Sequence, residues 1–271
     1  MPATPAWPPR SAPRLFVSER LGESVHITLD GPPAHYLGKV MRVGPGDAVV
    51  LCDDATGEWA ARVIEAGKRD VTLTVETLLR PREQVPDFWL CPALLKKDRF
   101  DLVLEKATEL GVRMIQPVVT RRCVADKLNP ERARAIVVEA AEQCARTALP
   151  ELEAPVKLDA LLRDWPTERT LFFADELGGT SAASAFADTE SPRRRGPQDS
   201  SHSTGGGPRP RGGAALLTGP EGGFDESERA AIRALPQAVA ISLGPRILRG
   251  ETAAIAGIAA WMALAGDWAA N

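Results

Sequence analysis

The chain has 271 residues, of which 44% are hydrophobic, 25% charged and 5% aromatic, and its formal net charge at pH 7 is -3. These fractions are typical of globular proteins and exclude a chain that is disordered throughout, collagen-like or embedded in a membrane. The small negative charge argues against a protein that coats nucleic acid through its overall field, but it is compatible with a local basic patch.

Residues 14–80 are predicted to form a small β-barrel domain, preceded by a flexible tail over residues 1–13. Runs rich in β-branched residues recur at a spacing of roughly ten residues and are separated by turn signals. The four predicted strands cover residues 24–29, 48–52, 59–65 and 71–76, with a short helix around 35–41. Residues 81–87 contain two prolines and no apolar period, which predicts a linker to a second domain.

Residues 88–271 are predicted to form an α/β domain with a mostly parallel sheet, because strand and helix patterns alternate along them. The predicted strands cover residues 88–94, 112–119, 169–174, 214–218 and 239–243. The predicted helices cover residues 98–110, 130–148, 225–235 and 251–266. The signals at helix ends are Asp98 as a cap, Gly111 as a stop, Asn129 before Pro130, and Asp225 with Glu228 in a capping box.

The alternation disappears between Ala182 and Gly213. Residues 192–213 contain five arginines among glycine, proline and serine. Such a segment buries too little apolar surface to offset its chain entropy, so we predict a flexible insertion over residues 182–213. A basic loop that touches RNA is one interpretation of it, and a tolerated insertion is the simpler one.

The cysteine and histidine patterns bear on compartment and metals. The four cysteines form no C-x-x-C pair, which is typical of reduced intracellular thiols, and the three histidines are dispersed, so we expect no metal site. The first 14 residues lack the apolar segment of a signal peptide. The longest run of low charge, residues 252–266, is too short to span a bilayer. We therefore expect a cytoplasmic protein without a membrane partner.

Two glycine-rich loops, residues 217–224 and 241–253, each lie between a predicted strand and a predicted helix. Ligands of open α/β sheets bind beyond the carboxyl ends of the strands, and glycine lets the backbone approach a ligand closely. Neither loop matches the phosphate-binding or dinucleotide-binding glycine patterns. A tight turn with a helix cap would account for the first loop alone, but the two loops in this order favour a binding site.

Together the motifs at residues 218–224 and 243–253 resemble the SPOUT methyltransferases. More narrowly, they resemble the RsmE family, the uridine N3-methyltransferases of 16S ribosomal RNA. The resemblance covers nearly the whole chain from residue 14 onward. Its further matches are at residues 14–16, 35–37, 41–43 with Gly46, 106–112, 115–117 and 139–146 with Pro150.

The resemblance implies a C-terminal SPOUT-type α/β knot, a trefoil-knotted parallel sheet with flanking helices, and an N-terminal PUA-like β-barrel. It further implies S-adenosylmethionine as cofactor, 16S ribosomal RNA within the assembled small subunit as substrate, and a homodimer whose active site is completed across the interface. The chain departs from the family pattern in three places, one of which is the insertion over residues 182–213, longer than the family's usual connection. Residues 121–123 read Arg-Arg-Cys instead of Glu-Arg-Ser, and Ala133 replaces an expected tryptophan.

The resemblance also assigns roles to individual residues. One side of the cofactor pocket would be formed by Leu217, Thr218, Gly219, Pro220, Glu221 and Gly222. The other side would be formed by Leu243, Gly244, Ile247, Leu248 and Thr252, with backbone groups facing the adenine. Arg249 is the candidate catalytic cation, and an ion pair with Glu251 or Glu221 is its structural alternative. Arg122, Gln143 and Arg146 are candidate RNA contacts, and a solvated face is their structural alternative. Gln143 and Arg146 share one helix face by their spacing.

The implied chemistry needs a cation more than a strong nucleophile. A methyl group on a sulfonium is already activated, so the enzyme has to align the attacking nitrogen and exclude water. An arginine would stabilise the anion that forms as the N3 proton of uracil leaves, and Glu109 or Glu221 could accept that proton. Two other functions stay open: a related enzyme with another RNA target, such as a transfer RNA ribose 2′-OH, or a non-catalytic RNA-binding module with a relic pocket.

Overall fold

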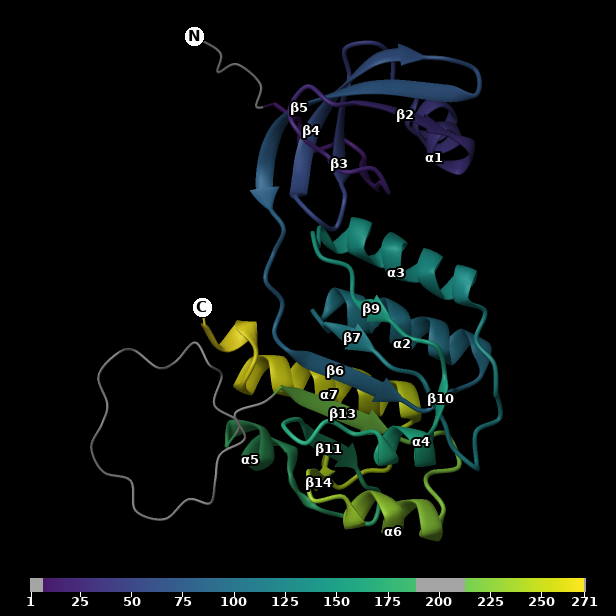
Figure 1. Ribbon diagram of the computed structural model, residues 1–271, viewed down its shortest axis with the longest axis vertical. Helices are drawn as coiled ribbons and strands as arrows, with labels where there is room; N and C mark the ends of the chain where they lie inside the picture. The colour runs from purple at the N-terminus through teal and green to yellow at the C-terminus, as the bar shows by residue number, and fades with distance from the viewer. Residues whose placement is uncertain (1–6, 189–212, 271) are drawn as a thin grey trace, which may run out of the picture. The chain divides into compact units, whose positions relative to one another are not determined.

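The computed structural model describes residues 7–188 and 213–270 of the chain (Figure 1). The chain divides into two compact units. Unit 1 comprises Met1–Gln84 and Val138–Leu149, and unit 2 comprises Val85–Val137 and Pro150–Asn271. Helix α3 (Pro130–Cys144) contributes to both units, so unit 1 draws on residues far beyond the predicted domain boundary.

Unit 1 contains a curled five-stranded sheet. Its strands are β1 (Arg14–Phe16), β2 (His26–Asp30), β3 (Ala48–Cys52), β4 (Gly57–Ala66) and β5 (Asp70–Pro81). They lie in the order β1-β3-β4-β5-β2, with β1 parallel to β3 and the other neighbours antiparallel. Among the described strands, β1 and β2 do not pair with each other, so the predicted PUA-like barrel is an open half-barrel.

A helical segment covers the core of this sheet. It consists of α1 (Gly31–His35) followed by the π-helix η1 (Tyr36–Met41). Leu37 is fully buried there, together with Leu51 of β3 and Leu73 of β5. The sequence predicted this helix only from residue 35. It begins earlier because prolines in its first turn have a helical φ and their missing N–H groups need no partner.

The N-terminal end of unit 1 differs from the prediction, whereas its last strand reaches the predicted start of the linker. Trp7 Nε1 donates a hydrogen bond to Glu76 (3.1 Å), and the Arg62 guanidinium lies 3.9 Å from the centroid of the Trp7 ring. The described part of the N-terminal segment therefore contacts the sheet, while residues 1–6 of the predicted tail lie outside the described residues. Strand β5 pairs with β4 as far as Pro81, where the predicted linker begins.

Unit 2 is built on a seven-stranded parallel sheet. In spatial order its strands are β12 (Thr180–Ser181), β14 (Ala238–Ser242), β11 (Thr170–Ala174), β13 (Ala214–Thr218), β6 (Phe88–Pro92), β7 (Met114–Ile115) and β9 (Glu151–Leu152). All neighbours are parallel, as predicted. A separate parallel pair joins β8 (Val118–Val119) and β10 (Val156–Lys157), so the strand predicted over 112–119 is divided in two at Pro117, which has no N–H to donate.

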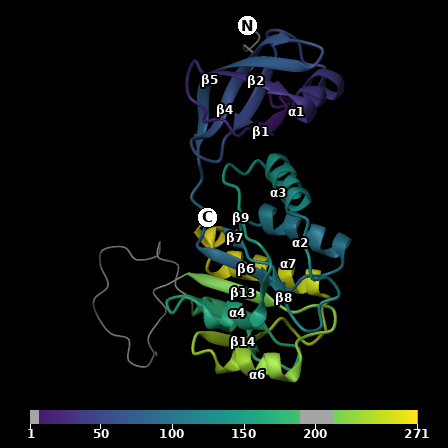
Figure 2. The ribbon, with the colours of Figure 1, turned by 45° about the vertical axis from the view of Figure 1, so that its right-hand side comes forward.

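Helices cover both faces of this sheet (Figures 1 and 2). They are α2 (Lys97–Glu109), α4 (Leu158–Arg163), α5 (Ala182–Ala187), α6 (Glu226–Ala234), α7 (Gly250–Leu264) and the 3-10 turn η3 (Asp267–Ala270). Ala215 and Leu217 of β13 pack in one cluster with Ile232 of α6. Leu216 faces α7 instead, where a Cβ on Gly257 would lie 2.4 Å from its Cδ2. The continuous apolar run of β13 thus belongs to a strand that is buried on both faces.

Helix α7 lies in the core of unit 2. Together with η3 it forms the one described stretch, Gly250–Ala269, that is long and apolar enough to be a candidate membrane span by length and composition. Ile258 and Met262 are fully buried, however, and the Trp261 ring stacks on Phe88 with centroids 4.2 Å apart. The packing is that of a core helix.

Three predicted helix-end signals are confirmed. The Asn129 side chain accepts a hydrogen bond from the Arg132 N–H (3.0 Å) at the start of α3. Gly111, just after α2, has a φ of +87°, as a helix stop requires. Asp225 and Glu228 form the capping box at the start of α6.

Other predicted boundaries are wrong. Helix α2 begins at Lys97, and its N-cap Lys96 makes no side-chain cap, so Asp98 lies within the first turn. Helix α3 ends at Cys144 rather than near residue 148, because Ala145 has a left-handed φ of +60°. Helix α5 occupies the first residues of the predicted insertion. Residues 189–212, which hold its arginines, lie outside the described residues, and the trefoil knot stays a prediction.

Candidate functional site

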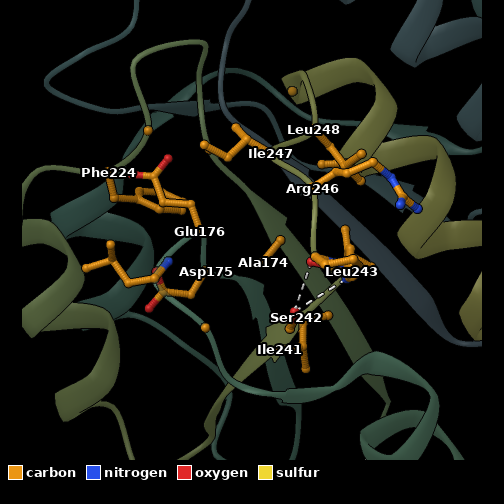
Figure 3. A pocket seen from close by; sticks show the side chains of 18 of the residues that line it. Ala174, Asp175, Glu176, Phe224, Ile241, Ser242, Leu243, Arg246, Ile247 and Leu248 are labelled. Carbon is orange, nitrogen blue, oxygen red and sulfur yellow. Dashed lines mark hydrogen bonds between the residues drawn. The ribbon is translucent and has the colours of Figure 1, made fainter.

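Three loops border an open cavity of about 300 Å³ at the carboxyl edge of the sheet in unit 2 (Figure 3). They follow β11, β13 and β14, which are neighbours in the sheet and parallel, so their carboxyl ends meet at one edge. The lining residues are Ala174, Asp175, Glu176, Leu177 and Gly178 after β11, Gly219, Pro220, Gly223 and Phe224 after β13, and Ile241, Ser242, Leu243, Gly244, Pro245, Arg246, Ile247, Leu248, Gly250 and Ala253.

The structure brings the two predicted glycine loops to this one cavity. The predicted cofactor residues that line it are Gly219, Pro220, Leu243, Gly244, Ile247 and Leu248. The others do not line it. Leu217 and Thr218 are buried within β13, and the Thr218 carbonyl accepts a hydrogen bond from Ala93 (2.9 Å). Glu221, Gly222 and Thr252 are exposed outside the lining.

The loop after β13 depends on glycine at its end. The Gly223 N–H donates to the Pro220 carbonyl (2.9 Å), which closes a tight turn. Gly223 has a φ of +65°, and a Cβ there would lie 2.6 Å from the carboxylate of Glu176. The next residue, Phe224, is buried and meets Phe173 edge-on at 6.5 Å between ring centroids. The turn therefore brings bare backbone to the wall of the cavity.

The loop after β14 forms the opposite wall. Gly244 has a φ of +115°, and its N–H lies 3.4 Å from the Ser242 hydroxyl. Ile247 is 88% exposed, so this loop presents an apolar side chain to the opening. At its end, a Cβ on Gly250 would lie 2.8 Å from Leu95 and 3.0 Å from the Gly219 carbonyl. The start of α7 thus packs closely against the first loop.

The third wall, after β11, was not predicted. The Asp175 side chain is fully buried and accepts hydrogen bonds from Arg229 Nε (3.0 Å), Arg233 Nη2 (2.7 Å) and the Leu177 N–H (3.1 Å). Burial alone would raise the pKa of Asp175, but these donors hold it below its ordinary value. Glu176 Oε1 accepts a hydrogen bond from Arg229 Nη2 (3.0 Å). The sequence signal that could have indicated this wall is the acidic pair Asp175 and Glu176, which directly follows a predicted strand and precedes two glycines.

Arg249 lies at the N-cap of α7, exposed and outside the lining of the cavity. Its two alternative ion pairs do not form. Glu251 is buried and pairs with Arg99 (2.6 Å), while Glu221 accepts a hydrogen bond from the backbone N–H of Lys96 (3.3 Å). Within residues 7–188 and 213–270 no carboxylate pairs with Arg249, so its charge is available to a partner.

The three candidate RNA contacts fall in different places. Arg122 is exposed in unit 2, and its Nη1 donates to the Gly222 carbonyl (2.9 Å) beside the cavity loops. Gln143 is exposed on α3 in the part of that helix that belongs to unit 1. Arg146 is buried, with 4% of its side chain exposed, and burial lowers its pKa to about 10. The shared helix face was predicted wrongly, because Arg146 follows the left-handed residue that ends α3.

Of the two candidate proton acceptors, only Glu221 lies near the cavity. Glu109 is the last residue of α2, and it pairs with Lys106 (2.8 Å). Glu221 lies at the other end of this helix, because it accepts a hydrogen bond from Lys96, the residue before the first residue of α2. At about 1.5 Å per residue the helix separates its two ends by roughly 20 Å. In the described ranges no group of three or more His, Cys, Asp or Glu is arranged to hold a metal ion.

Comparison with known proteins links both units to RNA modification. A family profile described as an RNA methyltransferase domain matches residues 82–262, and one described as an RNA methyltransferase PUA domain matches residues 29–76. The ribosomal RNA small subunit methyltransferase E of Rickettsia conorii is 29% identical over 247 residues, which cover 91% of this chain and 93% of that one. The protein of the same name in Bacillus subtilis is 27% identical over 261 residues, covering 91% and 94%.

Two solved structures are similar over nearly their whole length. One is the ribosomal RNA small subunit methyltransferase E of Neisseria gonorrhoeae bound to S-adenosylmethionine, with a TM-score of 0.75, 28% identity, and coverage of 95% of this chain and 99% of that one. The other is a methyltransferase of Legionella pneumophila with its cofactor S-adenosylmethionine bound, with a TM-score of 0.75, 27% identity, and coverage of 94% and 99%.

Proposed function

Because the chain belongs to the RNA methyltransferase family, we propose that it uses S-adenosylmethionine to methylate N3 of a uridine in the 16S ribosomal RNA of the small subunit. The observation that carries this proposal is the cavity formed by three loops at the carboxyl edge of the sheet. The relatives named above, which are similar over more than nine-tenths of this chain, include two whose structures hold S-adenosylmethionine.

The residues present fit this cofactor. Gly223 and Gly250 stand where a Cβ would collide with neighbouring protein atoms, so the loops pack closely on each other and leave backbone, not side chains, beside the cavity. Leu243, Ile247 and Leu248 offer an apolar wall suited to the flat face of adenine, and the loop glycines leave backbone groups accessible for its polar edge. These residues would hold the adenosyl part.

When bound, S-adenosylmethionine supplies a methyl group on a sulfonium. The residues of this chain then have to hold the uracil ring with N3 in line and exclude water. Arg249, which pairs with no carboxylate among the described residues and follows the loop after β14, would stabilise the negative charge that develops as the N3 proton leaves. Glu221, held by the Lys96 N–H, is the proposed acceptor of that proton.

The RNA would be held by cations around the same loops. Lys96, Lys97, Arg122, Arg246 and Arg249 are exposed there, and in the described part of the chain none of them forms an ion pair with a carboxylate. Each such cation can neutralise one phosphate and release a condensed counterion. Gln143 remains a proposed contact of unit 1, whereas the burial of Arg146 removes it from the proposed surface.

We further propose a cytoplasmic homodimer whose active site is completed by the partner subunit. Leu264 and Trp268, near the end of the chain, are 41% and 47% exposed, and large apolar side chains of this kind commonly lie in dimer interfaces. Sedimentation equilibrium tests this proposal, because a monomer at micromolar concentration would contradict it.

The experiment that tests the function is nucleoside mass mapping of small-subunit RNA from a deletion strain. We expect 3-methyluridine to be absent from one 16S position and restored by the intact gene. Persistence of that mark would contradict the proposed target, and loss of a transfer RNA 2′-O-methyl group instead would identify another target. A chain that binds no S-adenosylmethionine at millimolar concentration would be a non-catalytic module.

A further inference from the structure

The wall after β11 carries two carboxylates with different surroundings. Asp175 is fully buried, and both of its oxygens are engaged by Arg229 and Arg233. Glu176 is 41% exposed, and its Oε1 accepts a hydrogen bond from Arg229 Nη2 at 3.0 Å. Within the described residues, Oε2 of Glu176 accepts no hydrogen bond. Of the two carboxylates, Glu176 is therefore the one that can accept a hydrogen bond from a ligand in the cavity.

The position of Glu176 is fixed by a chain of charged contacts. Asp175 holds Arg229 through Nε, and the same guanidinium holds Glu176 through Nη2. Arg229 is itself only 13% exposed and lies on α6, whose start is fixed by a capping box. Gly223 leaves no side chain between Glu176 and the loop after β13. The carboxylate is thus oriented before any ligand arrives, which lowers the entropy cost of binding.

The same contacts indicate which ligand group this carboxylate suits. The positive charges of Arg229 and Arg233 balance the negative charges of Asp175 and Glu176, so the wall presents little net field to a cation. What remains is a directional acceptor. A ribose offers two neighbouring hydroxyl donors, and a carboxylate at the end of a strand is a common acceptor for such hydroxyls in α/β nucleotide sites. Figure 3 shows Glu176 across the cavity from Leu243 and Leu248, the proposed adenine wall.

We propose that Glu176 binds the ribose of the adenosyl ligand, with its carboxylate accepting hydrogen bonds from the 2′ and 3′ hydroxyls. This inference rests on the proposed use of S-adenosylmethionine and adds a residue that the sequence motifs did not indicate. Asp175 and Arg229 are positioning residues that act through Glu176.

Calorimetric titration of the full chain with three ligands tests this assignment. S-Adenosylmethionine carries a sulfonium and an ammonium, S-adenosylhomocysteine carries only the ammonium, and 5′-methylthioadenosine carries neither, but all three contain the same ribose. Because a hydrogen bond to a charged group is lost in each case, Glu176→Ala is expected to weaken all three by a similar factor of roughly 10- to 100-fold. Glu226→Ala, at an exposed position on α6, is the matched control and should change none of them.

Each outcome decides the question. A loss confined to S-adenosylmethionine, or shared only with S-adenosylhomocysteine, would mean that Glu176 recognises the sulfonium or the ammonium and would overturn the ribose assignment. Unchanged affinity for all three would reduce Glu176 to an ion-pair partner of Arg229. Failure of the unmutated chain to bind any of them would overturn the proposed function and this assignment with it. Thermal unfolding of Glu176→Ala, with a midpoint near that of the control, separates these results from misfolding.

Discussion

Replacing Asp175 by asparagine tests whether the buried charge holds the third wall of the cavity. The wild-type carboxylate has no exposed side-chain surface and accepts three hydrogen bonds, two of them from arginines. The asparagine side chain would keep the shape but remove the charge. Breaking a buried ion pair by neutralising one partner costs about 3–5 kcal/mol. Arg233 is 52% exposed and can be resolvated, and Arg229 keeps Glu176, so we expect a smaller loss of about 2–3 kcal/mol.

The assay is urea unfolding followed by far-ultraviolet circular dichroism, with Asp164→Asn as control. Asp164 also pairs with an arginine, Arg163 at 3.0 Å, but 68% of its side chain is exposed. Water screens an exposed pair almost completely, so the control should lose little of its free energy of unfolding. If Asp175→Asn loses no more than Asp164→Asn, the buried network does not stabilise unit 2 as argued.

The pH dependence of this difference gives a second test. The folded pKa of Asp175 is depressed, so its contribution to stability is fully present above the unfolded pKa, near 3.9, and is lost as pH falls through the folded value. The gap between wild type and Asp175→Asn should therefore be constant around neutral pH and shrink below about pH 4. A gap that grows on acidification would refute the sign of this reasoning.

Three further predictions follow from the site. Gly223→Ala places a Cβ toward Glu176 at positive φ, so it should lower stability by about 1 kcal/mol and also lower the affinity for the cofactor. Its control is Gly46→Ala, at a φ of +93° with open space around it, which should lower stability alone. Thermal melts measure the stability of both variants, and calorimetry measures their cofactor affinity. Arg249→Gln should reduce kcat for small subunits while leaving the dissociation constant of S-adenosylmethionine within about twofold, and an unchanged kcat would remove its catalytic role. Arg122→Gln, but not Arg163→Gln, should reduce the salt dependence of small-subunit binding by about one unit of log–log slope.

The strands and loops nearest the site could be predicted from local patterns. The apolar run of residues 214–218 and the capping box at Asp225 both place the first glycine loop between a strand and a helix, where the structure has it. Such signals depend on neighbours within about one helical turn, so a single sequence contains them in full. The order of the strands is not local in this way.

The position of the third wall of the cavity, after β11, could not be predicted from the sequence. Strand β11 precedes β13 by some forty residues, yet it lies between β13 and β14 in the sheet, and this places its loop in the cavity. The partners of Asp175 are Arg229 and Arg233, which are 54 and 58 residues away in the chain. No periodicity encodes such contacts. The wrong prediction for Arg146 has a local cause instead. Ala145 has a positive φ and ends the helix before Arg146, and a positive φ is uncommon for a residue other than glycine, so the sequence gives no sign of it.

The charge distribution explains how a chain with a net charge of -3 can act on RNA. Many arginines among the described residues, such as Arg99, Arg132 and Arg169, are paired with carboxylates. Each such pair has no net charge, so it contributes little to the electric field at a distance. Five exposed cations beside the cavity loops have no carboxylate partner among the described residues: Lys96, Lys97, Arg122, Arg246 and Arg249. At physiological salt the field of remote charges decays within about 8 Å, so a net charge of -3 does not prevent the proposed contacts between these local cations and RNA.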